Sequence, residues 1–266
     1  MAGEVLIRSL GRGLKVLQVI NQHRSLSMMS IARMCDLPYP TACRIVETLI
    51  EEQMIERESS RKHYRPTALV KTLSAGFQEE DALARISRRH IVKLTREVRW
   101  PVTLCTRVGM SMMIRDSTHA IAPFTLNIYH PGFTLPLLDS SSGKVYLAFS
   151  EEQEQDAILD HVRRTNAPNA ERLVPRLKAS FSEIRGKGYG IHERIRHTAN
   201  PGKTSAISVP IMRNGPCEAT ITLAFFSSSM SLPEAVASYI PSIKEAADLI
   251  AGEMAQLNMD DRRSLQ

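Results

Sequence analysis

The first quarter of the chain alternates short amphipathic stretches with polar breaks. Apolar residues recur at helical spacing in residues 9–21, and again after a break that ends at Ser27, whose hydroxyl is suited to cap a short second helix. Two prolines within residues 36–40 predict a turn, because proline lacks the N–H that a continuing helix needs. Residues 41–53 carry a full apolar stripe, which predicts a third helix.

A hairpin with a charged tip is predicted after these helices. Residues 54–57 and 62–66 have the pattern of short strands on either side of a polar turn at 58–61. Three helices followed by a hairpin is the order of a winged helix-turn-helix, whose recognition helix lies in the major groove of DNA. We therefore predict a DNA-binding domain over residues 1–67.

The predicted DNA contacts lie at the helix starts and in the hairpin. Residues near the N-terminus of a recognition helix reach base edges, and basic residues of a wing reach phosphates. The candidates are Ser27, Tyr39, Thr41, Ala42, Arg44, Arg57, Arg61, Lys62 and Arg65. The alternatives are that the winged helix mediates protein contacts, or that the arginine-rich hairpin is only a solvated tip.

Beyond the hairpin, the pattern divides the chain into a linker and a second domain. Residues 68–78 have the apolar spacing of one helix face, and a run of acidic residues follows at 79–81. Strand and helix patterns then alternate, which places the second domain in the α/β (α+β) class. We expect a linker helix over residues 68–80, a second domain over residues 81–259 and a polar tail over residues 260–266.

Composition adds two exclusions and one weak indication. No stretch approaches the roughly 18 apolar residues of a membrane span, and the first residues carry charges, so a cytoplasmic protein without a signal peptide is expected. The four cysteines are scattered, so no metal site is expected. The net charge of +6 and the pI of about 9.3 suit a polyanionic partner, although charge alone is weak evidence.

Motifs of common enzymes are incomplete in this sequence. The run SSSGKV lacks the first glycine and the final Ser/Thr of a phosphate-binding loop, and GKGYGI lacks the third glycine of a dinucleotide fingerprint. The histidines of HERIRH are five residues apart, not the four that place two zinc ligands on one helix face. We therefore expect neither catalysis nor a cofactor.

Several motifs follow one another along nearly the whole chain: RGLKVLQVIN, SIARMCDLPYPTACRIVETLIEEQMIER, PLLDSSSGKVYLAF, IRGKGYGIHE and PGKTSAISVPIMRNGPCEATITL. In these residues and in their order they resemble the motifs of IclR-type bacterial transcription regulators. Within that family, REVRWPVTLCT and MMIRDSTH resemble activators of aromatic-acid degradation, of the hydroxyphenylpropionate type. Two departures are Gln53, where the family usually has a glycine after the recognition helix, and Tyr39-Pro40, where polar residues are common.

The resemblance implies a fold, an assembly and a function. The second domain would be a GAF-like effector-binding domain with an antiparallel sheet flanked by helices, and the protein would assemble as a dimer or a tetramer. The implied partners are a double-stranded DNA operator, an aromatic carboxylate effector and RNA polymerase. The implied function is a ligand-responsive activator of an aromatic-acid catabolic operon. The alternatives are a repressor that responds to a different small carboxylate, and a ligand sensor whose winged helix serves protein contacts.

The family's effector pocket carries over to this sequence residue by residue. The two serines before Gly143-Lys144 match the pocket side of their motif, and His192 stands where the family often has an acidic residue. A carboxylate needs hydrogen-bond donors, and an aromatic ring needs apolar walls. The expected effector contacts are Trp100, Arg115, His119, Ser141, Ser142, His192, Thr204 and Thr222. Arg115 or His119 would neutralise the carboxylate.

Overall fold

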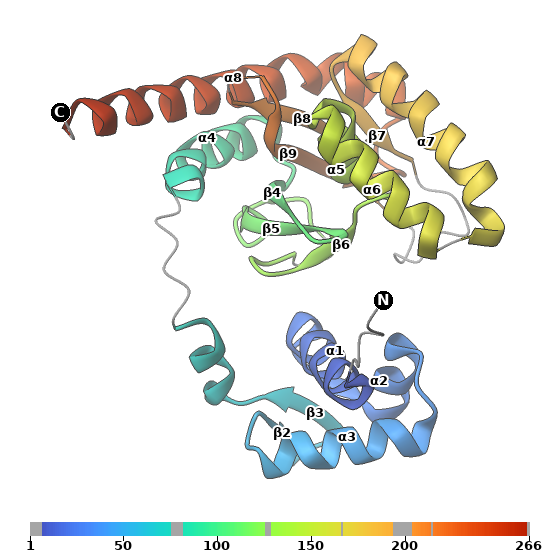
Figure 1. Cartoon of the computed structure of the whole chain (residues 1–266). Coiled ribbons are helices and arrows are strands. Elements are labelled where there is room, and N and C mark those ends of the chain that lie inside the picture. Colours follow the sequence, from blue (N-terminus) through green and yellow to red (C-terminus); the bar gives the residue numbers. More distant parts are fainter. Residues whose placement is uncertain are drawn as a thin grey trace. The chain divides into compact units, whose positions relative to one another are not determined.

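The computed structural model describes residues 7–75, 82–125, 129–165, 167–193, 204–213 and 215–264, with backbone alone for 167–168 and 258–264. The chain divides into two compact units, residues 1–80 and residues 81–266, whose helices and strands are labelled in Figure 1. The first unit is mainly helical with a small sheet, and the second has an antiparallel sheet flanked by helices. The predicted fold class is therefore confirmed.

The N-terminal unit contains three helices and a small antiparallel sheet. Its helices are α1 (Arg8–His23), α2 (Met28–Cys35) and α3 (Tyr39–Glu51). Its strands are β1 (Leu26–Ser27), β2 (Ile55–Arg57) and β3 (His63–Pro66), in the order β1-β3-β2. All three helices and β2 contribute to its core, which consists of Val16, Leu17, Ile20, Ile31, Cys35, Val46 and Ile55.

Three details of this unit differ from the sequence predictions. The patterns do not predict β1, which pairs Leu26 with Tyr64 of β3. Helix α3 begins at Tyr39, two residues earlier than predicted, because Pro40 lies in the first turn, where its missing N–H would have no helical partner anyway. After α3 the backbone of Gln53 has a φ of 58°. Glycine adopts that conformation without strain, which gives a physical reason for the glycine that the resemblance leads us to expect there.

The predicted linker helix is only partly described. Residues Ala68–Ser74 form a 3₁₀ helix, η1, where an α-helix was expected. The Thr67 hydroxyl caps it by accepting a hydrogen bond from the N–H of Leu69 at 3.2 Å. Residues 76–80, the rest of the expected helix, lie outside the described residues.

The C-terminal unit is built on a six-stranded antiparallel sheet in the order β6-β5-β4-β9-β8-β7. Its strands are β4 (Val102–Val108), β5 (Ser111–Ser117), β6 (Thr134–Pro136), β7 (Gly190–His192), β8 (Thr204–Met212) and β9 (Cys217–Phe226). Its helices are α4 (Ala82–Val98), α5 (Ser141–Phe149), α6 (Glu152–Thr165), α7 (Ala167–Lys187) and α8 (Leu232–Ser264). Because α8 continues to Ser264, residues 260–264 are helical and do not form the separate tail that was expected.

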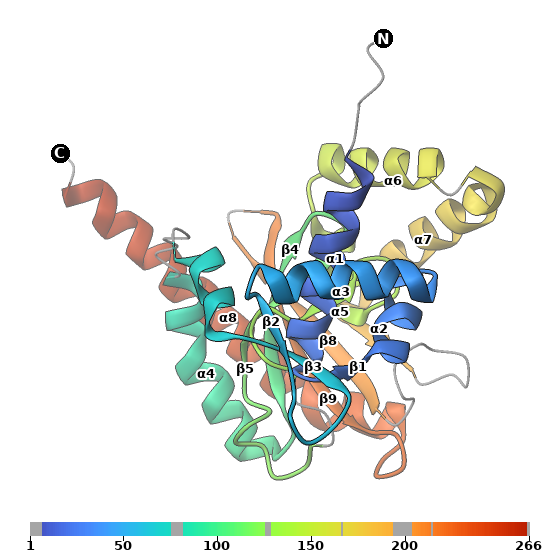
Figure 2. The same ribbon diagram turned by 90° about the horizontal axis from the view of Figure 1, so that it is seen from below.

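Helices cover both faces of this sheet. Within the C-terminal unit, α4 and α8 lie on one face and α5 and α7 on the other (Figure 1, Figure 2). Against α4 and α8 the strands bury a continuous apolar core that includes Leu104, Val209 and Ile221. The core against α5 and α7 is centred on residues such as Val145 and Phe181. Because successive strand residues point to opposite faces, the same strands also present buried hydroxyls on the α5 side.

Candidate DNA-contact surface and effector site

The predicted DNA contacts on α3 divide between exposed and buried positions. Tyr39 and Arg44 are exposed, and Thr41 is half-buried. Ala42 is fully buried, because it belongs to the apolar stripe that packs into the core. Its side chain is not available to a base edge, and that prediction is wrong. Arg44 has no ion-pair partner among the residues that the structure describes, so its guanidinium is available to a guanine or a phosphate.

Ser27 is engaged as a helix cap. Its hydroxyl accepts a hydrogen bond from the N–H of Ser30 at 3.3 Å and lies 2.9 Å from the Ser30 hydroxyl. This is the capping role that the sequence pattern indicates. A contact between Ser27 and DNA stays a prediction.

The hairpin between β2 and β3 carries fewer unpaired cations than its sequence suggests. Arg61 donates to Glu58 at 2.5 Å, and Arg65 donates to Glu56 at 2.7 Å. The hydrogen bond from Arg61 lowers the pKa of Glu58 to about 2, so this carboxylate is ionised at neutral pH. Within the described residues, the hairpin cations without an ion-pair partner include Arg57 and Lys62.

A row of hydroxyls, three buried and one half-buried, crosses the sheet face that α5 covers. The register pairs Gly190 of β7 with Ser208, Ser208 with Thr222, Thr222 with Thr103, and Thr103 with Ser117 of β5. Residues directly opposite each other in antiparallel strands point to the same face of the sheet. We call Ser208, Thr222, Thr103 and Ser117 the hydroxyl row.

Ser141, in the first turn of α5, joins this row. The hydroxyl of Ser208 donates to the Ser141 hydroxyl at 2.8 Å and lies 2.8 Å from that of Thr222. All three side chains are buried. The resemblance points to Ser141 and Thr222 but not to Ser208, although the alternation of Ser208 with the apolar Ile207 and Val209 indicates a strand with two different faces.

The start of α5 packs closely against the segment before it. A Cβ atom on Gly143 would lie 1.9 Å from the carbonyl oxygen of Leu137, so only glycine fits this position. The hydroxyl of Ser140 caps the helix by accepting from the N–H of Gly143 at 3.1 Å. The Ser142 hydroxyl donates to Ser140 at 3.1 Å. Ser142 is therefore directed at the cap and not at the hydroxyl row, and its predicted effector contact stays a prediction.

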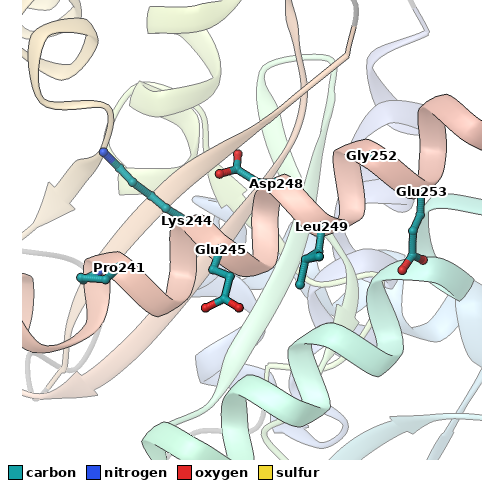
Figure 3. Close-up of a pocket in the computed structure, with 7 residues that line it drawn as sticks. All are labelled: Pro241, Lys244, Glu245, Asp248, Leu249, Gly252 and Glu253. Carbon is teal, nitrogen blue, oxygen red and sulfur yellow. The ribbon is translucent and has the colours of Figure 1, made fainter.

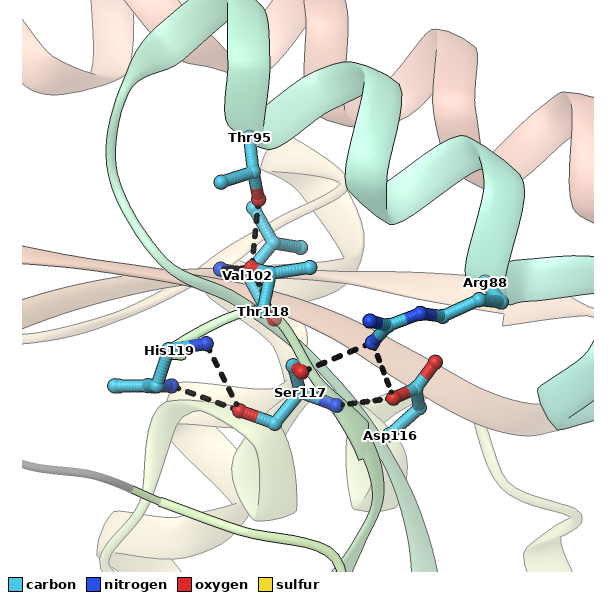
Figure 4. A network of polar contacts seen from close by, with 7 residues as sticks. All are labelled: Arg88, Thr95, Val102, Asp116, Ser117, Thr118 and His119. Atoms are coloured by element: carbon cyan, nitrogen blue, oxygen red, sulfur yellow. Dashed lines mark hydrogen bonds and ion pairs between the residues drawn. The ribbon is translucent and has the colours of Figure 1, made fainter. Parts of the chain in front are cut away.

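Aromatic rings lie at the β5 end of the row. The Nδ1 atom of buried His119 is 2.9 Å from the Ser117 hydroxyl (Figure 4). Its ring packs edge-on against Tyr129, with centroids 5.1 Å apart, and Tyr129 packs against Phe133 in the same way at 4.9 Å. Burial lowers the pKa of His119 to about 4, so the imidazole is neutral at pH 7. His119 can hydrogen-bond a ligand, but in this state it does not supply the positive charge expected of it.

Arg115 lies at a bulge in β5. Cys105 pairs with Ile114 and Leu104 pairs with Asp116, so Arg115 faces no residue of β4 in the ladder. Its side chain is half-buried, and this loss of solvent lowers its pKa. The guanidinium nevertheless stays protonated at physiological pH. Of the two residues expected to neutralise a carboxylate, Arg115 is the one that carries a charge.

His192 and Thr204 lie at the opposite side of the sheet. His192 ends β7, and its Nδ1 atom is 3.2 Å from the carbonyl oxygen of Asp139, whereas Thr204 begins β8. Four strand spacings of about 4.8 Å, roughly 19 Å in total, separate β7 from β5. His192 therefore starts from the far side of the sheet from His119, and its predicted effector contact stays a prediction. The segment 194–203 before Thr204 lies outside the described residues.

Trp100 belongs to the core beneath α4 and α8. Its indole N–H donates to the hydroxyl of Tyr239 in α8 at 3.1 Å. Its ring packs against three phenylalanines, Phe124, Phe225 and Phe226, at centroid distances of 5.1, 6.4 and 5.3 Å. The structure does not bring Trp100 together with the hydroxyl row, so its predicted role as a ligand wall is corrected to a role in the core.

A polar network connects the β5 end of the row to α4 (Figure 4). Arg88 of α4 donates to Asp116 at 2.8 Å and to the carbonyl oxygen of Ser117 at 3.1 Å. The hydroxyls of Thr95 in α4 and Thr118 after β5 are 2.6 Å apart, and both side chains are buried. Since α4 is the first helix after the expected linker, this network joins the candidate effector site to the helix nearest the N-terminal unit in the sequence.

Other kinds of site find no support in the part of the chain that the structure describes. No group of three or more His, Cys, Asp and Glu residues there could hold a metal ion, and no helix there is long and apolar enough to cross a membrane. Burial raises the pKa of Cys105 and of Cys217 to about 12, so both are unreactive thiols. A shallow surface depression runs along α8, away from the hydroxyl row (Figure 3).

Comparison with known proteins decides the family. Residues 9–59 match the IclR helix-turn-helix domain, and residues 68–251 match the C-terminal domain of the bacterial transcriptional regulator IclR. The chain belongs to the IclR family of transcriptional regulators. It therefore combines a DNA-binding domain with an effector domain, and it is a regulator and not an enzyme.

Relatives of this IclR-family chain are distant but span its length. The HTH-type transcriptional regulator TsaQ1/TsaQ2 of Comamonas testosteroni is 22% identical, over 95% of this chain and 90% of its own length. An IclR family transcriptional regulator from Brucella abortus is 21% identical, with a TM-score of 0.65 over 94% of each chain. An IclR homolog from Microbacterium hydrocarbonoxydans, complexed with 4-hydroxybenzoate, is 20% identical, with a TM-score of 0.59 over 93% of this chain and 99% of its own. At these identities the two structures support a shared fold.

Proposed function

We propose that this regulator binds an aromatic carboxylate at the hydroxyl row and in response activates transcription of an aromatic-acid catabolic operon. The observation that carries the proposal is the position of the row beside the rings of His119, Tyr129 and Phe133. Hydroxyls donate to carboxylate and phenol oxygens, and ring edges pack against a bound aromatic ring. The homolog from Microbacterium hydrocarbonoxydans was solved with 4-hydroxybenzoate, an acid of this class.

Two features support a negatively charged ligand in this proposal. Arg115, at the bulge of β5, is proposed to supply a guanidinium, and its partial burial strengthens the attraction for an anion. Ser141 lies in the first turn of α5, and the N-terminus of a helix favours negative charge. These features support a carboxylate over a neutral aromatic ligand.

The proposed response passes from the effector site to α4. The hydrogen bonds of Arg88 and Thr95 connect this part of the site to α4. A ligand that contacts His119 or Ser117 is proposed to change the equilibrium between two conformations of this network. An effector shifts such a balance only as far as it binds one arrangement better than the other. The active species is proposed to be a homodimer or tetramer that contacts its operator through Arg44 and the hairpin cations and acts with RNA polymerase.

A pair of serine variants tests the effector site. Ser208→Ala removes the hydroxyl shared by Ser141 and Thr222, so we expect the Kd for the effector to rise about tenfold. Ser205→Ala is the matched control, because Ser205 is a buried serine of the same strand that faces the other side of the sheet and bonds Ser227 at 2.9 Å. A thermal-shift screen of hydroxyphenylpropionates, hydroxybenzoates and short aliphatic acids identifies the ligand, and calorimetry measures its Kd.

The outcomes of this experiment are distinct. If no aromatic acid raises the melting temperature, the proposed ligand class is wrong. If both serine variants lose affinity equally, the hydroxyl row is not the binding site. Transcription in vitro with the operator then decides the sign of regulation, since a fall in transcript on adding the effector would identify a repressor.

A second experiment tests the DNA contact of Arg44. Arg44→Ala removes an exposed cation from the start of α3, so we expect weaker operator binding and a salt dependence that is shallower by about one unit in log Kd against log salt concentration. Arg176→Ala, an exposed arginine on α7, is the control and should change neither quantity. Unchanged DNA binding by Arg44→Ala would favour a winged helix that serves protein contacts.

A further inference from the structure

Helices α4 and α8 lie side by side and present a common exposed face. Glu97 of α4 accepts from the hydroxyl of Ser242 in α8 at 3.1 Å, and His90 lies 3.0 Å from Glu253. The residue numbers rise along one helix as they fall along the other, so the two helices are antiparallel. The depression along α8, lined by residues of that helix, is part of the exposed side of the pair (Figure 3).

Cations predominate on α4 and carboxylates on α8 at this face, although Glu97 of α4 accepts from Ser242 and Lys244 of α8 donates to the carbonyl oxygen of Lys187 at 3.2 Å. Arg85, Lys93 and Arg96 are exposed on α4, at spacings that place them on one side of a helix. Glu245 and Asp248 are exposed on α8. In the part of the chain that the structure describes, none of these five side chains has an ion-pair partner, whereas the neighbouring Arg89 is bound by Glu253. A cationic stripe therefore lies beside an anionic stripe.

Next to these charges, α8 presents one apolar and one small residue. Leu249 is 43% exposed, and, apart from the backbone of its own helix, no atom lies within 4 Å of the position that a Cβ on Gly252 would take. Small residues on a helix allow another helix to approach closely, because the distance between packed helices depends on the side chains at the contact.

We infer that this face binds the same face of a second copy of the chain, with α4 of one copy over α8 of the other. In an interface with two-fold symmetry each contact occurs twice, so a face with one stripe of each sign is complementary to itself. A nucleic acid fits this face poorly, because the carboxylates of α8 repel phosphates. This face would be an interface of the proposed homo-oligomer, so the inference rests on the self-association that the proposed function includes.

The size of the face indicates a weak contact. The 17 residues of α4 extend about 25 Å, and two packed helices are about 20 Å wide, so each copy contributes roughly 500 Å². Stable interfaces bury about 800 Å² on each partner. A contact of this size gives a weak association, which is measured through the concentration dependence of assembly.

Complementary charge reversals test the face in the full-length protein. One variant carries Lys93→Glu and Arg96→Glu, and the other carries Glu245→Lys and Asp248→Lys. In sedimentation equilibrium, each variant alone should show one association step weakened at least about tenfold, because like charges then meet at every copy of the contact. An equimolar mixture should regain the wild-type association, because each variant then meets a partner of opposite charge at both contacts.

Controls separate this effect from misfolding and from net charge. Arg176→Glu and Glu171→Lys reverse exposed charges on α7, and they should leave association unchanged alone and in mixture. Circular dichroism checks that every variant folds, and recovery in the mixture itself requires folded partners.

The remaining outcomes overturn the inference in different ways. If the reversed variants associate like wild type, or if the mixture associates no better than either variant, this face is not the interface. If the reversed variants bound DNA more weakly but associated with each other as wild type does, the face would bind DNA phosphates and not a second copy. A wild-type protein that is monomeric at every concentration would refute both the face and the proposed oligomer. Effector affinity, measured on the same samples, reports separately on the proposed effector site.

Discussion

The two faces of the six-stranded sheet come from the same strands but differ in chemistry. In β8, Ile207 and Val209 point into the apolar core beneath α4 and α8, whereas Ser208 between them points to α5 and bonds two other hydroxyls. In β4, Leu104 and Thr103 divide in the same way. One strand can therefore stabilise the fold on one side and present polar groups on the other, because its side chains alternate. The comparison predicts that substitutions on the apolar face change stability, whereas substitutions on the polar face change the proposed effector binding.

The largest expected effect is on the apolar face. Leu104→Ala removes a fully buried side chain and leaves a cavity, so we expect the free energy of unfolding to fall by about 2–5 kcal/mol. Urea unfolding measures the loss, and Val108→Ala, an exposed position at the end of the same strand, should change stability by less than about 0.5 kcal/mol. The Kd for the effector should not change in the folded protein. If Leu104→Ala changed that Kd strongly and stability only slightly, the apolar face and not the hydroxyl row would be the one that binds the effector.

An intermediate effect is expected from pH at the other face. The pKa of His119 is about 4 in the folded protein and 6.5 in its unperturbed state, because burial disfavours the imidazolium. Between these values the unfolded chain binds more protons, so stability is fully present above about pH 6.5 and is lost as pH falls toward 4. At pH 5 the loss due to His119 is about 2 kcal/mol.

Variants assign this pH dependence to His119. Urea unfolding of His119→Phe at pH 7 and pH 5 should show a smaller loss of stability on acidification than wild type. His161→Asn, at an exposed position of α6, should keep the wild-type pH dependence. If His119→Phe loses as much stability between pH 7 and pH 5 as wild type, burial does not hold this imidazole neutral.

The smallest effect on stability is expected within the hydroxyl row. Thr222→Val keeps the shape of the side chain and removes its hydrogen bond to Ser208, at a cost of about 1 kcal/mol in unfolding free energy. The loss of effector-binding free energy should exceed the loss of unfolding free energy. Calorimetry measures the effector Kd on the same samples. A variant that loses stability but keeps effector affinity would make Thr222 a structural member of the row.

Helix patterns and caps could be predicted from the sequence because they depend on local residues. The cap at Ser27 and the apolar stripe of α3 lie within a few residues of what they determine. The strands β1, β6 and β7 could not be predicted, because two or three residues show no periodicity and pair only with partners brought near by the fold.

The candidate site could be predicted only in part. Its residue types follow from the resemblance, but their surroundings do not. The sequence does not show that Arg61 and Arg65 are held by acids of the same hairpin, or that His119 is buried enough to lose its charge. Trp100 shows the same limit, because a large aromatic residue serves a ligand wall or a core equally well until its neighbours are known.

The spacing of the hydroxyl row has a consequence for the choice of ligand. Its members come from adjacent strands, and hydrogen bonding between the strands holds them about 4.8 Å apart. A substitution can delete one hydroxyl of the row but cannot move another along it. For the proposed effector, the backbone therefore determines which separation between two ligand oxygens this face can match, and a change of side chain leaves that separation the same.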